Sequence, residues 1–250
     1  MLSFSIITCT LNSEPFIARC IESVASQTYP NIEHVFVDGG SEDGTLDRIK
    51  HTSGNIKYLT GVRGGISNAM NVGVEISSGD VIAHLHGDDY YLHDQVIARV
   101  AGVFDSSQAQ WLYGRIVSDL AGRLVKPDWQ LPEFSLSRLL RGNFIAHPAA
   151  FVRREEFLKS GGFDCGLKYA MDYDLWLRLA KMSAPVGLDE YFSAFRRHAA
   201  SASTANALAA FEEDQAVRRR HRPAGPALQF FHEAIYQYRR ARLGHLPWNR

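Results

Sequence analysis

Apolar positions in the first hundred residues follow two alternating spacings. Short apolar, β-branched runs predict strands at residues 4–9, 32–37, 56–59 and 81–85. Apolar residues three or four positions apart predict helices at residues 14–26, 45–50 and 66–76. Strands that alternate with helices are typical of a doubly wound, parallel α/β sheet, in which ligands bind beyond the carboxyl ends of the strands.

The second half of the chain has a less regular pattern. Two strands are predicted at residues 111–118 and 149–152, and an amphipathic helix at residues 173–182. This mixture indicates an α+β arrangement rather than a continuation of the strand and helix alternation.

From about residue 205 the pattern becomes helical only. It contains an Arg-rich run at residues 218–222 and a final helix predicted at residues 227–242. We therefore expect one domain over residues 1–204, divided into halves at residues 105 and 106, and a helical C-terminal extension over residues 205–250.

The composition excludes several classes of protein. The 27 Lys and Arg residues balance the 27 Asp and Glu residues, so no nucleic-acid partner is expected. The 3 cysteines form no CxxC pair, which predicts reduced thiols rather than a zinc site. No leader-like segment is visible, and no run approaches the roughly 18 apolar residues that span a bilayer. We therefore expect a cytoplasmic protein.

Two adjacent carboxylates follow the fourth predicted strand. Asp88 and Asp89 come after Gly87, which lets the backbone turn at the edge of the sheet. Carboxylates there would bind a divalent cation, and the cation would bind a diphosphate. Alternatively, the pair forms an Asx-turn or caps the next helix, predicted to start near Leu92.

Several segments resemble family 2 glycosyltransferases. They include SIITCTLN at residues 5–12, SVASQTYPNIE at residues 23–33 and VDGGSEDGT at residues 37–45. The likeness extends from Phe4 to about Ser203. It implies the GT-A fold, a Rossmann-like and mostly parallel sheet flanked by helices. It also implies a nucleotide-sugar-binding first half, an acceptor-binding second half, and Mn²⁺ or Mg²⁺ as cofactor.

The resemblance implies roles for particular side chains. The donor-binding positions are Thr8, Leu11, Asn12, Asp38, Arg63, Gly65, Asn68 and Asp88. Asp89 is the expected metal ligand, with His198 as a further ligand, and Asp88 is expected to hold ribose or a metal-bound water. Thr8 and Asp38 are expected to contact the base, with Asp38 accepting from a ring N–H as in uridine recognition.

A structural alternative exists for three of these positions and for His147. Asp38 could be a turn residue at a strand end, and Asn68 could face solvent or cap a helix locally. Arg63 stands where relatives often carry an acidic residue, so it is either a phosphate ligand or an exposed loop cation. His147 fits a family position near the acceptor, or it packs within a turn. His86 cannot share a strand face with both aspartates and is not expected in the site.

An acidic segment at residues 171–179 resembles the acceptor motif of the family. Asp172 falls on the position of the base that deprotonates the acceptor hydroxyl. The acidic residue that usually precedes it is replaced by Met171. Alternatively, Asp172 is only the N-cap of the helix. A helix N-terminus would also favour the ionised carboxylate.

These features predict an inverting hexosyl- or hexosaminyltransferase. It would move one sugar from a nucleotide diphosphate sugar, preferably a UDP-sugar, to a glycan or lipid-linked acceptor in cell-surface polysaccharide synthesis. The chain lacks the Gln-x-x-Arg-Trp motif that accompanies processive members. A non-catalytic nucleotide-sugar-binding scaffold is the main alternative, and a sugar-phosphate nucleotidyltransferase is a further one. Aromatic and basic residues in the final helix predict peripheral contact with the inner face of a membrane, or else a solvated helix that packs on the core.

Overall fold

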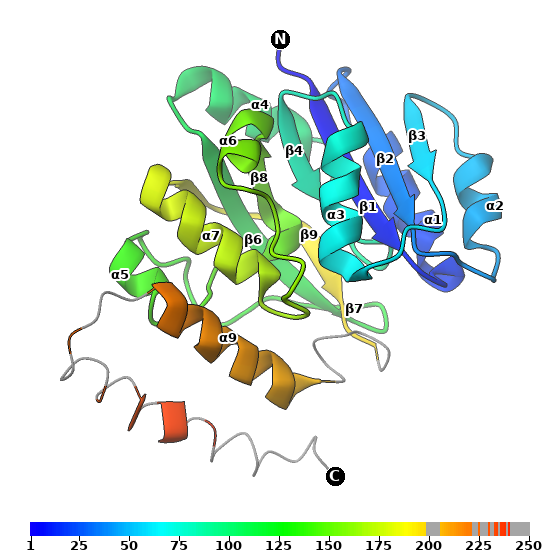
Figure 1. Cartoon of the computed structure of the whole chain (residues 1–250). Helices are drawn as coiled ribbons and strands as arrows, with labels where there is room; N and C mark the ends of the chain where they lie inside the picture. Colours follow the sequence, from blue (N-terminus) through cyan, green and yellow to red (C-terminus); the bar gives the residue numbers. More distant parts are fainter. Residues whose placement is uncertain are drawn as a thin grey trace.

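One nine-stranded sheet runs through the protein, with helices on both faces (Figure 1). The computed structural model describes residues 1–198 and 206–221, together with residues 225, 230, 233, 234, 236–238 and 240. The strands are β1 (Phe4–Thr10), β2 (Ile32–Asp38), β3 (Ile56–Leu59), β4 (Val81–His84), β5 (Tyr90–Tyr91), β6 (Trp111–Leu120), β7 (Arg123–Val125), β8 (Ala150–Arg153) and β9 (Val186–Arg196). Their order is β3-β2-β1-β4-β8-β6-β9-β5, and β7 pairs with β6.

The first four strands are parallel, as the alternating pattern predicts. β8 reverses the direction because it pairs antiparallel with both β4 and β6. β9 then runs parallel to β6 and antiparallel to β5. The α/β class is therefore confirmed, with a parallel sheet in the first half and a mixed one in the second.

The helices divide between the two faces of the sheet (Figure 1). They are α1 (Glu14–Ala25), α2 (Thr45–Lys50), α3 (Gly65–Ile76), α4 (Val96–Ser106), α5 (Leu136–Leu139), α6 (Arg154–Lys159), α7 (Met171–Met182) and α9 (Ala207–His221), with a 3₁₀ turn η1 (His147–Ala149). Side chains from α3, α6 and α7 share one apolar core, whereas α1 and α4 contribute to the other. The central strands are thus covered on both sides.

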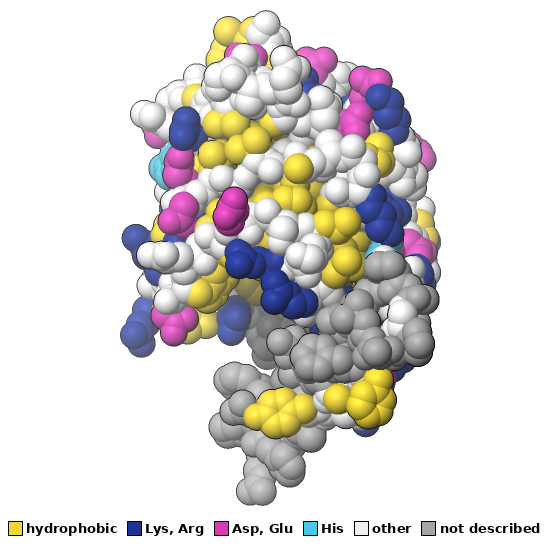
Figure 2. All heavy atoms as spheres, turned by 90° about the vertical axis from the view of Figure 1, so that its left-hand side faces the viewer, with side chains coloured by type: hydrophobic (Ala, Val, Ile, Leu, Met, Phe, Trp, Pro, Cys, Tyr) yellow, Lys and Arg dark blue, Asp and Glu magenta, His cyan; other side chains and the backbone are white. Residues whose placement is uncertain are grey.

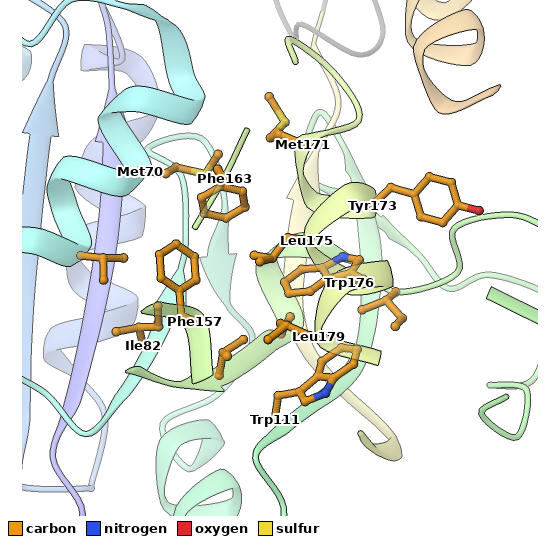
Figure 3. Packing of buried hydrophobic residues seen from close by; sticks show 14 of the residues in the cluster. Met70, Ile82, Trp111, Phe157, Phe163, Met171, Tyr173, Leu175, Trp176 and Leu179 are labelled. Carbon is orange, nitrogen blue, oxygen red and sulfur yellow. The ribbon is translucent and has the colours of Figure 1, made fainter. Parts of the chain in front are cut away.

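The pleat of the strands explains the two cores. In β1, Ile7 and Cys9 face the core that contains α3 and α7, whereas Phe4 and Ile6 face the core that contains α1 and α4. Every residue of β1 is buried, which is why its sequence carries no charged residue and alternates less clearly than a strand with one exposed face. In the first core, aromatic and aliphatic side chains of α7 pack against the second half of the sheet (Figure 3).

Gly73 allows α3 to lie close to the sheet. A Cβ atom at this position would overlap the Ile7 side chain and lie 3.3 Å from a methyl group of Val37. We therefore expect Gly73→Ala to lower the free energy of unfolding by about 1–3 kcal/mol, measured by urea denaturation. Gly102→Ala in α4 is the matched control, because nothing lies within 4 Å of a Cβ there. Equal stability of Gly73→Ala and the wild type would show that α3 can shift at no cost.

The C-terminal extension begins with a helix, as predicted, because α9 covers residues 207–221. The expected domain boundary at residue 204 and most of the expected helix at residues 227–242 lie outside the described residues. Peripheral membrane contact through that helix therefore stays a prediction. In the described part of the chain, no helix is both long and apolar enough to cross a membrane. Figure 2 shows basic and acidic side chains interspersed on one face of the molecule.

Candidate active site

A cavity of about 690 Å³ lies where the carboxyl ends of β1 and β4 meet the start of α7. In an α/β sheet this is where ligands are expected, because loops from several strands converge there. Its walls come from residues 9–13, the loop before α3 at residues 62–66, the segment after β4 at residues 86–89, and the residues that lead into α7. The cavity therefore joins both halves of the domain.

The structure brings Asp88, Asp89 and His198 to one wall of this cavity. The imidazole Nε2 of His198 lies 3.0 Å from Oδ2 of Asp88. The His198 ring also packs on Phe16, with the ring centroids 4.6 Å apart. The backbone N–H of Arg196 donates to Oδ1 of Asp89 at 3.1 Å. Strand β9 thus carries His198 across to the segment that follows β4.

Asp89 is buried beside another carboxylate. Burial and the negative charge of Asp88 raise the pKa of Asp89 well above its usual range, and Arg196 only partly opposes this. A bound cation would relieve both effects, and carboxylate and imidazole are a donor set suited to Mn²⁺. Among the described residues, no group of three or more His, Cys, Asp and Glu side chains could hold a metal ion. A metal ion held here by the protein would therefore also need oxygen ligands from a substrate or from water.

Besides Asp88, four of the expected donor-binding residues line the cavity. They are Leu11, Asn12, Arg63 and Gly65. Asn12 has a positive φ of 50° and its side-chain oxygen accepts from the N–H of Glu42 at 2.9 Å. Arg63 is exposed, and its guanidinium lies against the turn at Gly40. These positions form the rim of the cavity on the side of β1 and β2.

Three other expected donor-binding residues are absent from the cavity wall. The Thr8 hydroxyl is buried in the sheet, where it donates to the carbonyl of Leu85 at 2.7 Å and contacts the ring of His34 at 2.8 Å. The Asn68 amide donates to the carbonyl of Arg63 at 2.6 Å. For Thr8 and Asn68, the structure favours a role in holding strands and loop together over contact with a ligand.

Asp38 lies in the turn at the end of β2, which is the structural alternative to contact with the base. Its carboxylate accepts from the N–H groups of Gly40 and Ser41 at 2.8 and 2.9 Å, and from the Ser41 hydroxyl. Only the following residue, Gly39, lines the cavity. Asp38 therefore forms the turn at the end of β2, and its contact with the base stays a prediction.

Two further histidines, His86 and His147, line the cavity, although His86 was not expected in the site. His86 and His147 stack with ring centroids 5.0 Å apart, and both face the cavity. Burial lowers the pKa of each ring, and for His147 the neighbouring His86 and His84 lower it further. Within the described structure, both ring nitrogens of His147 lack a hydrogen-bond partner. The exclusion of His86 was wrong because strand-face parity does not apply beyond His84, where β4 ends.

Asp172 lines the opposite half of the cavity from its place in the first turn of α7. It is not the N-cap, which is Ala170. Burial, and after it the charge of Asp214, raises the pKa of Asp172 to about 7. The preceding Met171 is 8% exposed and packs in the core near Met70 (Figure 3). The residue that replaces the expected acid thus adds apolar surface beside Asp172.

Other lining residues gave no sequence signal. Thr10 ends β1, Phe16 and Ile66 belong to the starts of α1 and α3, and Lys168 and Tyr169 precede α7. A Thr at a strand end or a Phe in a first helical turn is common in any α/β protein. Their place in the cavity follows from the way in which the two halves of the sheet join.

Two solved structures, TarS and a mannosyltransferase, have the same fold. Staphylococcus aureus TarS (residues 1–349) in complex with UDP-GlcNAc matches with a TM-score of 0.73 and 20% identity, over 94% of this chain and 72% of that chain. The mannosyltransferase PcManGT from Pyrobaculum calidifontis, in complex with GDP-Man and Mn²⁺, matches with a TM-score of 0.69 and 16% identity, over 94% of this chain and 69% of that chain. These likenesses confirm the expected GT-A type of fold.

Relatives in sequence lead to the same class of enzyme. A PGL/p-HBAD biosynthesis glycosyltransferase from Mycobacterium bovis is 32% identical over 180 residues, which is 70% of this chain and 68% of that protein. An uncharacterized glycosyltransferase from Rickettsia felis is 32% identical over 197 residues, but the match spans only 32% of its length. The model of glycosyl transferase family 2 matches residues 5–162. The chain therefore belongs to glycosyl transferase family 2.

Proposed function

We propose that the chain is an inverting transferase that moves one sugar from a nucleoside diphosphate sugar to a hydroxyl group of a glycan or lipid-linked acceptor. The observation that carries the proposal is that one cavity contains the acidic pair with His198 and, from the other half of the domain, Asp172. The first group suits a metal and a diphosphate, and the second suits a base. Two separate chemical tasks of sugar transfer thus have candidate residues within reach of one substrate.

On the donor side, the proposal gives each group a separate task. Asp89 and His198 would hold Mn²⁺ or Mg²⁺, and Asp88 would hold the ribose or a metal-bound water. The bound cation would neutralise the charge that develops on the leaving diphosphate. Arg63 at the rim can hold a phosphate with two parallel N–H donors. Backbone atoms near Gly65 can approach the donor closely because no side chain intervenes.

On the acceptor side, Asp172 would remove the proton of the acceptor hydroxyl. As that oxygen bonds to the anomeric carbon, the bond from this carbon to the diphosphate oxygen breaks on the opposite face. The configuration at the carbon is therefore inverted, and the proton ends on Asp172. One carboxylate suffices, because no covalent sugar intermediate is formed.

We favour UDP-sugars as donors and cell-surface polysaccharide synthesis as the setting. One structural neighbour was solved with UDP-GlcNAc, although another was solved with GDP-Man. One group of relatives is named for PGL/p-HBAD biosynthesis, and a Pasteurella multocida relative is a chondroitin synthase. A panel of UDP- and GDP-sugars with Mn²⁺ or Mg²⁺, scored by diphosphate release and by binding, tests the proposal. Failure of every donor to bind in the presence of metal would refute it.

The ionisation of Asp172 predicts the pH dependence of transfer. The carboxylate acts as a base only when it is ionised, and the ionised fraction falls as the pH drops through its pKa of about 7. With metal and donor saturating, we expect kcat to be level at higher pH and to fall about tenfold per pH unit below about 7. A stopped-time assay of diphosphate release across this range measures the profile. A kcat that stays level down to about pH 5.5 would exclude Asp172 as the base.

A further inference from the structure

The C-terminal helix α9 packs directly against the part of the domain that carries Asp172 (Figure 1). Val217 of this helix is fully buried in the same core as α7. His221 Nε2 lies 2.8 Å from Oδ1 of Asp174, and both side chains are buried. The Arg220 guanidinium bonds to Asp164 at 2.7 Å. The helix is thus docked along α7 by apolar and charged contacts.

Glu213 makes the most specific of these contacts. Its carboxylate accepts from three consecutive backbone N–H groups, those of Lys168, Tyr169 and Ala170, at distances from 2.5 to 3.1 Å. These residues lead into α7, whose N-cap Ala170 has no side chain that can accept a hydrogen bond. The first N–H groups of a helix need an acceptor. From another helix, Glu213 accepts from the N–H of the N-cap residue Ala170 and from the N–H groups of the two residues before it.

The bonded segment is part of the cavity wall. Lys168 and Tyr169 line the cavity, and Asp172 follows them within the first turn of α7. The Glu213 contact therefore fixes the backbone two residues before Asp172 in the chain. It also orders the side of the cavity that faces the proposed acceptor.

A second carboxylate of α9 acts on Asp172 through its charge. Two influences raise the pKa of Asp172. Burial is the larger, and the negative charge of Asp214 is the second. Asp214 is itself half-buried, and this burial raises its pKa to about 6, while Arg218 lowers it and Glu213 raises it. Near neutral pH, Asp214 is therefore mostly ionised and keeps Asp172 more basic than burial alone would.

We infer that α9 is a positioning element of the active site, in which Glu213 fixes the backbone that carries Asp172 and thereby holds the next residue, Asp214, at the same end of α7. The inference rests on the proposed function, because it needs Asp172 as the base. Helix α9 lies outside residues 5–162, the part that matches the family model. The C-terminal extension is accordingly part of the catalytic unit rather than an independent appendage.

The surroundings of Asp172 show why Asp214 is the residue to change. The Asp172 carboxylate accepts from the N–H of Tyr173 at 2.6 Å and from the side chain of Asn143. Both hydrogen bonds favour the ionised form of Asp172. The titratable and charged side chains around this part of the cavity are Asp214, Glu213 and Arg218 of α9, Lys168, and His86 and His147 on the floor. Among them, Asp214 is the charged group with the leading effect on the pKa of Asp172.

Two variants and one control test the inference. Asp214→Asn should move the acid limb of the kcat profile to lower pH, an effect that loss of packing alone would not produce. Glu213→Ala should lower kcat about tenfold or more, with the affinity for UDP in Mn²⁺ unchanged. Glu212→Gln is the control, because Glu212 is exposed on the same helix and pairs with Arg240 instead. The assay measures diphosphate release from the donor that the panel identifies, with acceptor or with water as nucleophile.

The outcomes separate this inference from the proposed function. If Asp172→Asn is inactive while Asp214→Asn leaves the acid limb unmoved, the inference is overturned and the base assignment stands. A wild-type kcat in Glu213→Ala would overturn it equally. If Asp172→Asn retains full transfer, the base assignment fails and the inference fails with it. UDP binding by each variant shows that the fold is intact.

Discussion

Asp172→Asn is expected to lower kcat for sugar transfer by about 10²- to 10⁴-fold, the contribution of a positioned base. The substitution keeps the size of the side chain and an oxygen that can accept from the N–H of Tyr173. It removes the only carboxylate that lines the acceptor side of the cavity in the described structure. Steady-state assays of diphosphate release measure kcat, and calorimetry measures donor affinity. Donor affinity should change little, because Asp172 lies apart from the acidic pair.

A second variant separates loss of the base from general damage. Asp105→Asn replaces an exposed carboxylate in the last turn of α4, outside the cavity. Its kcat should equal that of the wild type. If both variants transfer sugar equally well, the chain either uses another base or acts as a binding scaffold. Tight donor binding without metal-dependent turnover in the wild type would favour the scaffold directly.

The parallel half of the fold could be predicted from the sequence because its signals are local. Strands β1, β2 and β4 are buried on both faces, so each is rich in apolar residues and lies between helices, whereas the edge strand β3 is partly exposed. β9 could not be predicted in the same way. Its first half carries Asp189 and Glu190, whose partners Arg115 and Arg99 are distant in sequence. A strand stabilised by such pairs lacks the apolar pattern that identifies strands locally.

The sequence predicts the position of a site residue when that residue directly follows a strand. It does not predict the direction in which the side chain points. Asp88 and Asp89 follow β4 directly, so their place at the sheet edge follows from the strand. Thr8 and Asp38 also stand in or at the end of strands, but their side chains satisfy buried or turn partners. Sequence alone does not show which way such a hydroxyl or carboxylate points.

The role of Glu213 shows a further limit of prediction. In the sequence it is one acid in the run Glu212-Glu213-Asp214, in the middle of a helix with little apolar character. Only the packing of α9 against α7 separates the exposed Glu212 from Glu213, which caps the other helix. Long-range contacts of this kind leave no periodic signal. They also explain why the extension looked separate from the domain.

Asp89→Ala and Asp89→Asn are expected to abolish the part of donor affinity that depends on metal. We expect the gain in UDP affinity that Mn²⁺ gives the wild type to be lost, a change of about 100-fold or about 2.8 kcal/mol. Asp89 is buried with its pKa raised by burial and by Asp88, so a cation is the partner that its ionised form lacks. Asp89→Asn keeps an acceptor for the N–H of Arg196, which preserves the local fold. Calorimetry with Mn²⁺ and with EDTA measures the difference. In EDTA the variants and the wild type should bind UDP alike, whereas an equal gain from Mn²⁺ in all three would place the metal elsewhere.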